Sequence, residues 1–177
     1  MMQEERREGD PGWSPDGNSL IFGAGSFASG KFAIYQLDLR TKEVSQLPGS
    51  EGLFGPRWSA DGRQVVALRV GIFNLMLFDF KSGKWVELTS YFGGWPRWSR
   101  DGKYVYIHYS AAGEEVLSRI EVRGRKIERL VRLEGMRRVG IFGSWVGWTP
   151  DDSPLVLRDI GTQDVYALEW QTPEREK

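Results

Sequence analysis

The chain has 177 residues, enough for one ordinary domain with a single core. Its 24 basic and 24 acidic side chains leave no net charge, so the composition does not point to a nucleic acid, an acidic membrane or a highly charged substrate. The absence of cysteine excludes disulfides, thiolate metal sites and a cysteine nucleophile.

The first ten residues, MMQEERREGD, are charged and contain no apolar stretch, so we expect a disordered segment here and not a signal peptide. No run approaches the roughly 18 apolar residues that a membrane-spanning helix needs. The sequence as written therefore favours a cytoplasmic chain. A periplasmic location is left open if the N-terminus is truncated.

From Pro11 onward the sequence repeats one phrase four times, as WSPDG, WSADG, WSRDG and WTPDD. The tryptophans that open it are separated by 45, 40 and 50 residues, a period typical of propeller blades. Each phrase is followed by two strand-like runs, and in the first three repeats by a turn and a last short strand. We therefore predict an all-β fold, a β-propeller of four antiparallel meander blades, at about 11–50, 51–91, 92–140 and 141–171, with a disordered tail at 172–177.

The repeated phrase predicts a structural corner, because a catalytic site is needed once and this phrase recurs. Its Pro, Asp and Gly suit a hairpin turn in which the glycine takes a positive φ, and its Trp is large enough to fill the gap between neighbouring sheets. We expect Trp58 and Trp98 to be buried there, and Asp152, aligned with the glycines, to strain or reshape its turn. The residues assigned this structural role are Trp13, Asp16, Gly17, Trp58, Asp61, Gly62, Trp98, Asp101, Gly102, Trp148 and Asp151.

The repeats resemble the WD40-like PD40 repeat of TolB-type β-propellers over roughly Pro11 to Trp170. The closing stretch TPDDSPLVLRDIGTQDVYALEW is similar to the last blade of bacterial propellers that follow a winged-helix DNA-binding domain. No winged helix is present in this sequence, so the resemblance implies DNA contact only through a domain that is absent here. Such families use the propeller as a sensory or regulatory interaction module.

The number of blades departs from this resemblance, because TolB-like propellers usually have six or more and this sequence holds four motifs. The fourth repeat lacks an outer strand, since QTPEREK follows Trp170 directly. The chain is either a tight four-bladed ring or, as we favour, the C-terminal part of a larger propeller. In the second case its open ends favour self-association.

Two arginines and several loop aromatics are the candidates for ligand binding. Arg57 and Arg97 lie between the Pro and the Trp of an inner strand, on the opposite face from both, where they would line a central channel and favour an anion or a carboxylate. Structural ion pairing is an equally good interpretation of both arginines. Glycine-rich aromatic loops precede three of the Trp motifs, and equivalent loops gather on one face of a propeller. Their candidate residues are Phe54, Phe92, Trp95, Phe142 and Trp145.

We expect no catalytic residue, metal or cofactor, because His108 is the single histidine and no nucleophile motif such as GxSxG occurs. The sequence favours a non-catalytic interaction or sensing module of a bacterial regulatory protein, which binds a protein or a small anionic ligand on its loop face. The alternatives are an accessory propeller domain of a hydrolase or peptidase and a periplasmic TolB-like scaffold.

Overall fold

The computed structural model describes residues 7–26, 29–91, 93–111, 114–135 and 146–161. Within these ranges every regular element is a β-strand, as the all-β prediction requires, and fourteen strands form four antiparallel sheets. In the same ranges, the structure contains no helix that is long and apolar enough to cross a membrane.

Three of the sheets are four-stranded meanders, in which each strand pairs with the next along the chain. The first sheet contains β1 (Arg7–Trp13), β2 (Ser19–Ser26), β3 (Lys31–Asp38) and β4 (Val44–Gln46). The second contains β5 (Leu53–Trp58), β6 (Gln64–Arg69), β7 (Leu75–Asp79) and β8 (Lys84–Thr89). The third contains β9 (Gly94–Trp98), β10 (Tyr104–Ala111), β11 (Glu114–Glu121) and β12 (Ile127–Arg132). The described part of the fourth is the hairpin of β13 (Val146–Trp148) and β14 (Pro154–Val156).

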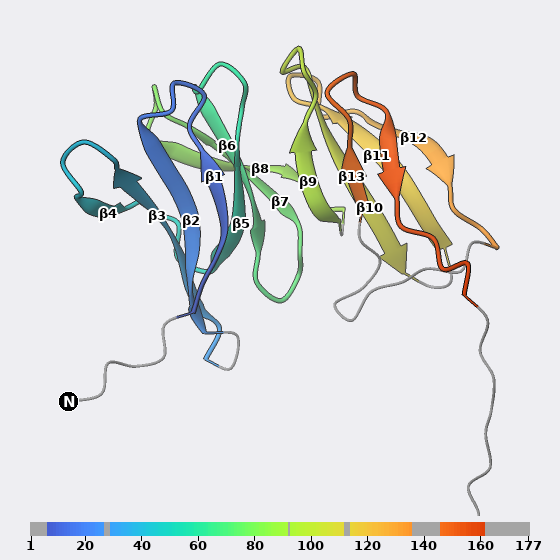
Figure 1. Ribbon diagram of the computed structural model, residues 1–177, viewed down its shortest axis with the longest axis horizontal. Coiled ribbons are helices and arrows are strands. Elements are labelled where there is room, and N and C mark those ends of the chain that lie inside the picture. Colours follow the sequence, from blue (N-terminus) through green and yellow to red (C-terminus); the bar gives the residue numbers. More distant parts are fainter. Residues whose placement is uncertain (1–6, 27–28, 92, 112–113, 136–145, 162–177) are drawn as a thin grey trace, which may run out of the picture.

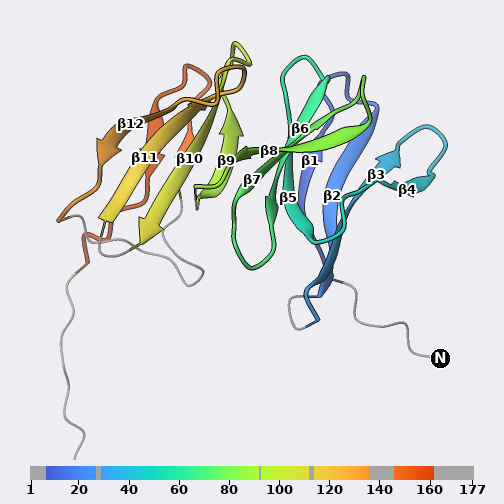
Figure 2. The same cartoon turned by 180° about the vertical axis from the view of Figure 1, so that it is seen from behind.

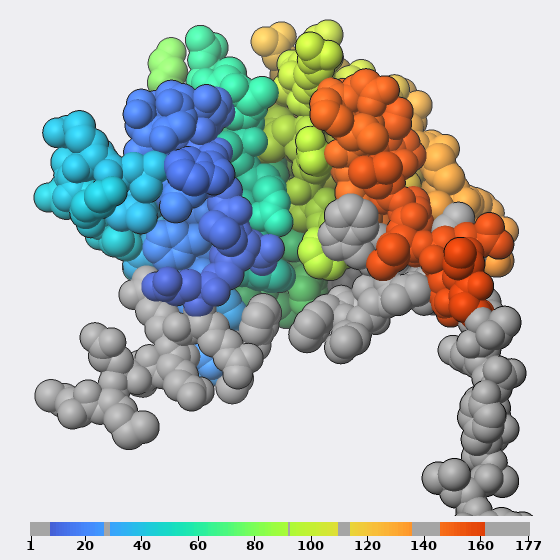
Figure 3. Space-filling view, viewed as in Figure 1, coloured from blue at the N-terminus to red at the C-terminus, as the bar shows by residue number. Residues whose placement is uncertain are grey.

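The sheets stand side by side in chain order, so that the first and the last are separated by the second and third (Figures 1 and 2). The space-filling view follows the same order across one face of the molecule, from blue through green to orange (Figure 3). This is the arrangement of propeller blades, in which the second, third and fourth sheets span residues 53–89, 94–132 and 146–156. The predicted loss of an outer strand after Trp170 lies outside the described residues.

The first strand begins earlier than the boundary expected at residue 11. β1 starts at Arg7, and its residues Arg7, Glu8 and Gly9 pair with Gly25, Ala24 and Gly23 of β2. Backbone pairing needs no apolar side chains, which is why a charged, unpatterned stretch can extend a strand.

The apolar cores lie between neighbouring sheets. Val65 and Val66 are adjacent on β6 and both fully buried, because alternate side chains of a strand point to opposite faces. Val65 packs toward the first sheet and Val66 toward the third. The core between the first and second sheets contains Ile21, Ile34 and Leu47 with Val65, Ala67, Met76 and Phe78. The core between the second and third contains Val66, Leu68, Leu75 and Leu77 with Trp98, Val105, Ile107 and Ile120. The core between the third and fourth contains Tyr106, Leu117 and Leu133 with Val146 and Trp148.

The repeated tryptophans pack against the sheet that precedes their own. Trp98 and Trp148 are 7% and 4% exposed, and the Trp98 indole Nε1 donates to the carbonyl oxygen of Arg57 at 3.0 Å. The predicted burial is confirmed for Trp98. Trp58 is only half-buried and stacks on Phe80 with 4.9 Å between ring centroids. Trp13, in the first sheet, is 65% exposed. The burial of a repeated tryptophan therefore depends on a neighbouring sheet and is not set by the repeated phrase alone.

The turn of the phrase is held by one set of hydrogen bonds, shown best in the third sheet. The Gly102 N–H donates to the Ser99 carbonyl at 3.0 Å, and the Ser99 hydroxyl donates to Asp101 at 2.7 Å. The Lys103 N–H also donates to Asp101, and these bonds lower the pKa of Asp101 from 3.8 to about 2. The predicted positive φ is confirmed at Gly17, Gly62 and Gly102, with values of 73°, 71° and 69°.

The fourth turn differs as the sequence predicts. Asp152 has a φ of 65° in the position of the glycines. The Thr149 hydroxyl accepts from the N–H of Ser153, four residues on, whereas the Ser99 hydroxyl accepts from Tyr104, five residues on. The turn is therefore one residue shorter. Both carboxylate oxygens of Asp152 lie 3.2 Å from the backbone nitrogen of Arg100, which links this turn to the one before it.

Candidate functional site

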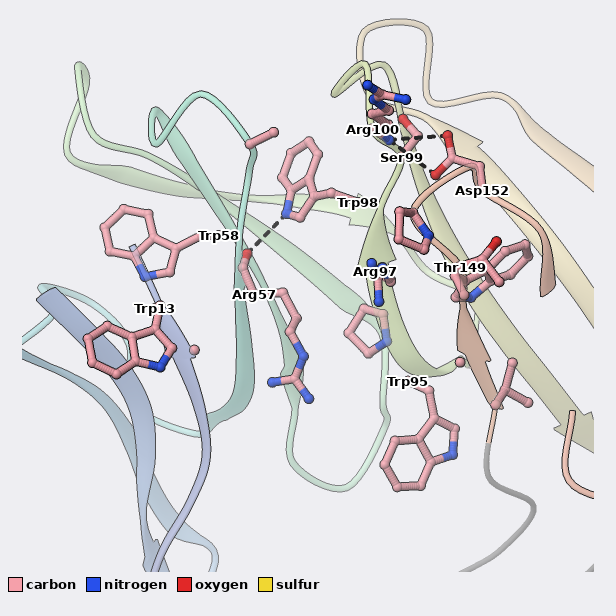
Figure 4. A pocket seen from close by; sticks show the side chains of 17 residues that line it. Trp13, Arg57, Trp58, Trp95, Arg97, Trp98, Ser99, Arg100, Thr149 and Asp152 are labelled. Atoms are coloured by element: carbon pink, nitrogen blue, oxygen red, sulfur yellow. Dashed lines mark hydrogen bonds between the residues drawn. The ribbon is translucent and has the colours of Figure 1, made fainter. Parts of the chain in front are cut away.

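The inner strands β1, β5, β9 and β13, together with the turns that follow β5, β9 and β13, line a groove of about 770 Å³. Its walls combine indole rings and guanidinium groups, notably those of Trp13, Trp58, Trp95, Arg57 and Arg97 (Figure 4). A volume of this size falls in the range of sites for small molecules.

A β-bulge precedes the Pro of each inner strand in the first three sheets. In β1, the two residues between Gly9 and Gly12 oppose one residue of β2, and the same count recurs in β5 and β9. The residue at each bulge is left-handed, with φ values of 54° at Asp10, 61° at Gly55 and 52° at Trp95. Glycine is the usual residue at such a bulge, and another residue there costs about 1–2 kcal/mol.

The side chain of Asp10, at the bulge of the first sheet, reaches the second sheet. Asp10 Oδ1 lies 3.2 Å from Arg57 Nη2, and Arg57 Nη1 donates to the carbonyls of Asp10 at 3.3 Å and Pro56 at 2.8 Å. Arg57 is therefore a structural ion-pair partner, one of the two interpretations that the sequence left open. An ion pair as exposed as this one contributes little to stability, at most about 1 kcal/mol.

Arg97 occupies in the third sheet the position that Arg57 occupies in the second. The bulge of the sheet before Arg97 holds Gly55, which has no side chain. Arg97 is exposed along the groove, and within the described part of the chain its guanidinium forms no hydrogen bond or ion pair. The two arginines that the sequence treats alike thus differ, because only one has a carboxylate opposite it.

Of the predicted ligand-binding residues, the structure brings Arg57, Arg97 and Trp95 together on the groove. Phe54 lies elsewhere, in the packing between sheets, with its ring 6.0 Å from that of Phe32 and 5.7 Å from that of Phe73. The remaining candidates, Phe92, Phe142 and Trp145, lie outside the described residues.

Asp10, the partner of Arg57, is not among the predicted site residues, because it lies in the segment expected to be disordered. An available signal was the alignment of DPGW with GPRW and WPRW, which places Asp10 at the same position as Gly55 and Trp95. The role of Asp10 as the partner of Arg57 follows from the packing of two sheets, which the alignment does not contain.

The acidic and histidine side chains do not form a centre in the groove. His108 is 5% exposed, with Nε2 3.8 Å from Glu115 Oε2. In the described part of the chain, no three His, Asp or Glu side chains are arranged to hold a metal ion. The Ser hydroxyls of their own turns lower the pKa of Asp16 and Asp61, consistent with a role in the turn.

Comparison with known proteins supports the fold. No protein-family model matches the sequence. A curated relative is an uncharacterized protein of Agrobacterium fabrum, Atu1656, which is 28% identical over 149 residues. The match covers 82% of this chain and 47% of the relative, so the chain spans about half the length of that protein.

Among solved structures, TolB from Acinetobacter baumannii superposes with a TM-score of 0.67 at 21% identity, over 91% of this chain and 40% of TolB. Acylaminoacyl peptidase from Pyrococcus horikoshii superposes with a TM-score of 0.60 at 13% identity, over 81% of this chain and 26% of the peptidase. The chain has the fold of a TolB-type β-propeller, as the PD40-like repeats predict.

Proposed function

We propose that this chain is a non-catalytic recognition module of a bacterial regulatory protein and that its groove binds an anionic ligand. The observation that carries the proposal is Arg97, an exposed guanidinium without a counter-charge among the described residues, placed on a groove between tryptophans. A guanidinium presents planar donors that fit a carboxylate or another oxyanion in a bidentate geometry, and a strand holds it in place.

The likeness to acylaminoacyl peptidase concerns the fold over 26% of that chain and does not favour a peptidase function for the groove. A hydrolase needs a nucleophile and a base within hydrogen-bonding reach of each other. The charged side chains that line the groove are those of Arg57, Arg97, Arg100 and Asp152, and the Asp152 carboxylate already accepts from the Arg100 amide. Recognition of an anion is the chemistry these groups suit.

The test is a titration of the isotope-labelled chain with millimolar acetate or inorganic phosphate, followed by NMR at constant ionic strength set with chloride. We expect at least one anion to shift the amide signals of β5 and β9 and the indole N–H of Trp95 in a saturable way, and to be recovered unchanged. Glycerol is the neutral control. Saturable shifts absent for both anions, or confined to residues outside the groove, would contradict the proposal.

A further inference from the structure

Comparison of the sheets with one another indicates what kind of anion the groove takes. We infer that Arg97 binds the carboxylate of a small aromatic molecule, in the way that Arg57 binds Asp10, and that the ring of this molecule packs on Trp95. The inference rests on the proposed function, since it names the ligand class of the same groove.

The first step is the equivalence of the two arginines. Arg57 and Arg97 each stand between Pro and Trp, and each pairs with the second strand of its sheet at the same register, Arg57 with Val66 and Arg97 with Tyr106. Arg57 already shows what this position binds, because its guanidinium holds the Asp10 carboxylate at 3.2 Å. Because the two arginines are equivalent, a carboxylate is the expected partner of Arg97.

The second step is the space opposite Arg97. Gly55 is at the bulge of the sheet that precedes Arg97, just as Asp10 is at the bulge of the sheet that precedes Arg57. Among the described residues, a side-chain carbon at Gly55 would meet Asp10 Oδ2 and Leu68 Cδ1 within 4 Å, each at 3.9 Å, so there is room for a side-chain carbon at this position. Arg100 lies at the other end of the groove, beside Asp152 (Figure 4). One guanidinium without a counter-charge balances a carboxylate better than it balances a phosphate dianion.

The third step is Trp95, which lines the groove from β9, two residues before Arg97, and lies at one end of it (Figure 4). Its φ of 52° is uncommon for a bulky residue, and such strain is found where the surrounding structure imposes it, often at binding sites. An indole face favours an aromatic ring in an offset or edge arrangement. A groove of about 770 Å³ admits a molecule that reaches both Trp95 and Arg97.

The experiment uses phenylacetate as the probe, with acetate and 2-phenylethanol as its charged and aromatic halves, in NMR titrations of the full chain. We expect Arg97→Gln to weaken phenylacetate binding about tenfold or more, because it removes the bidentate partner. Trp95→Gly, which suits the left-handed bulge, should weaken phenylacetate about fivefold and leave acetate binding unchanged. Arg63→Gln, an equal charge change in the exposed turn after β5, is the matched control and should bind as the unchanged chain does.

A second pair of variants tests the site from within. Gly55→Asp supplies a carboxylate opposite Arg97 and should abolish acetate and phenylacetate binding. Gly55→Asn has nearly the same shape without the charge, tolerates a positive φ, and should retain most of the binding. Urea unfolding of each variant verifies that it is folded.

The outcomes separate this inference from the function on which it rests. If the unchanged chain binds no anion in the groove, the proposed function fails. If it binds phenylacetate but Arg97→Gln binds equally well, or Gly55→Asp equals Gly55→Asn, only the assignment to Arg97 fails. If phosphate binds more tightly than acetate at equal ionic strength, the assignment of a carboxylate is overturned.

Discussion

Asp152 shows how one side chain can offset the strain of its own backbone. It holds a φ of 65°, which costs a residue other than glycine about 1–2 kcal/mol. Its carboxylate accepts the Arg100 N–H of the neighbouring turn, and a hydrogen bond to a charged group contributes a similar amount, about 1.5–3 kcal/mol before exposure to solvent reduces it. The aligned glycines have neither the strain nor the bond.

This balance predicts that Asp152→Ala is more destabilising than Asp152→Gly. Alanine keeps the strain and loses the bond, whereas glycine loses both, so the free energies of unfolding should differ by about 1 kcal/mol. Urea denaturation measures the difference. Gly102→Ala is the control for strain alone, since nothing lies within 4 Å of the added carbon. Equal stability of the two Asp152 variants would show that the turn relaxes around alanine.

At the scale of the sheets, the junction between neighbours is the unit that stabilises the molecule. The same tryptophan occurs in each repeat, yet Trp98 is buried against the second sheet and Trp13 is 65% exposed. The two residues therefore form a matched pair that differs in packing and not in residue type or turn.

We predict that Trp98→Ala lowers the free energy of unfolding by about 3–5 kcal/mol, because it leaves a cavity in the core between the second and third sheets and removes the indole bond to Arg57. Trp13→Ala should change it by less than about 1 kcal/mol. Chemical denaturation of both variants measures the effect. Similar losses for the two would mean that Trp13 is buried in solution.

The sequence predicts turns well and packing between sheets less well, for a physical reason. The positive φ of Gly17, Gly62 and Gly102 follows from bonds within a few residues, so the local sequence contains the cause. The bulge at Asp10 and Trp95 depends on the pairing register of two strands, and the ion pair of Asp10 with Arg57 joins residues 47 positions apart. Neither can be derived from a phrase read in isolation.

For the whole molecule, no other sheet of the described residues packs on the face of the first sheet that points away from the second. Its residues are equivalent to positions that are buried in the second sheet: Leu20, Phe22, Tyr35 and Leu37 are half-buried, whereas Val65, Ala67, Met76 and Phe78 are buried. Phe22 and Tyr35 stack on this face with 6.0 Å between ring centroids. Apolar faces of this kind recruit other sheets.

We therefore predict that the 177-residue chain self-associates. Size-exclusion chromatography with light scattering should give a mass above 20.2 kDa that rises with concentration. Combined Phe22→Ser and Tyr35→Ser should shift the chain toward the monomer, whereas Val131→Ser, a polar change on the exposed outer strand β12, should not. A concentration-independent monomer of the unchanged chain would contradict the prediction.

The bulges of β1, β5 and β9 also suggest how such a protein changes what it recognises over evolutionary time. One backbone geometry displays a carboxylate at Asp10, no side chain at Gly55 and an indole at Trp95. Regular pairing resumes two residues later in each strand, so a substitution at the bulge changes one side chain without moving a strand. The first three repeats therefore differ in chemistry at one position of a constant backbone, and under the proposed function a new specificity would need only point mutations there.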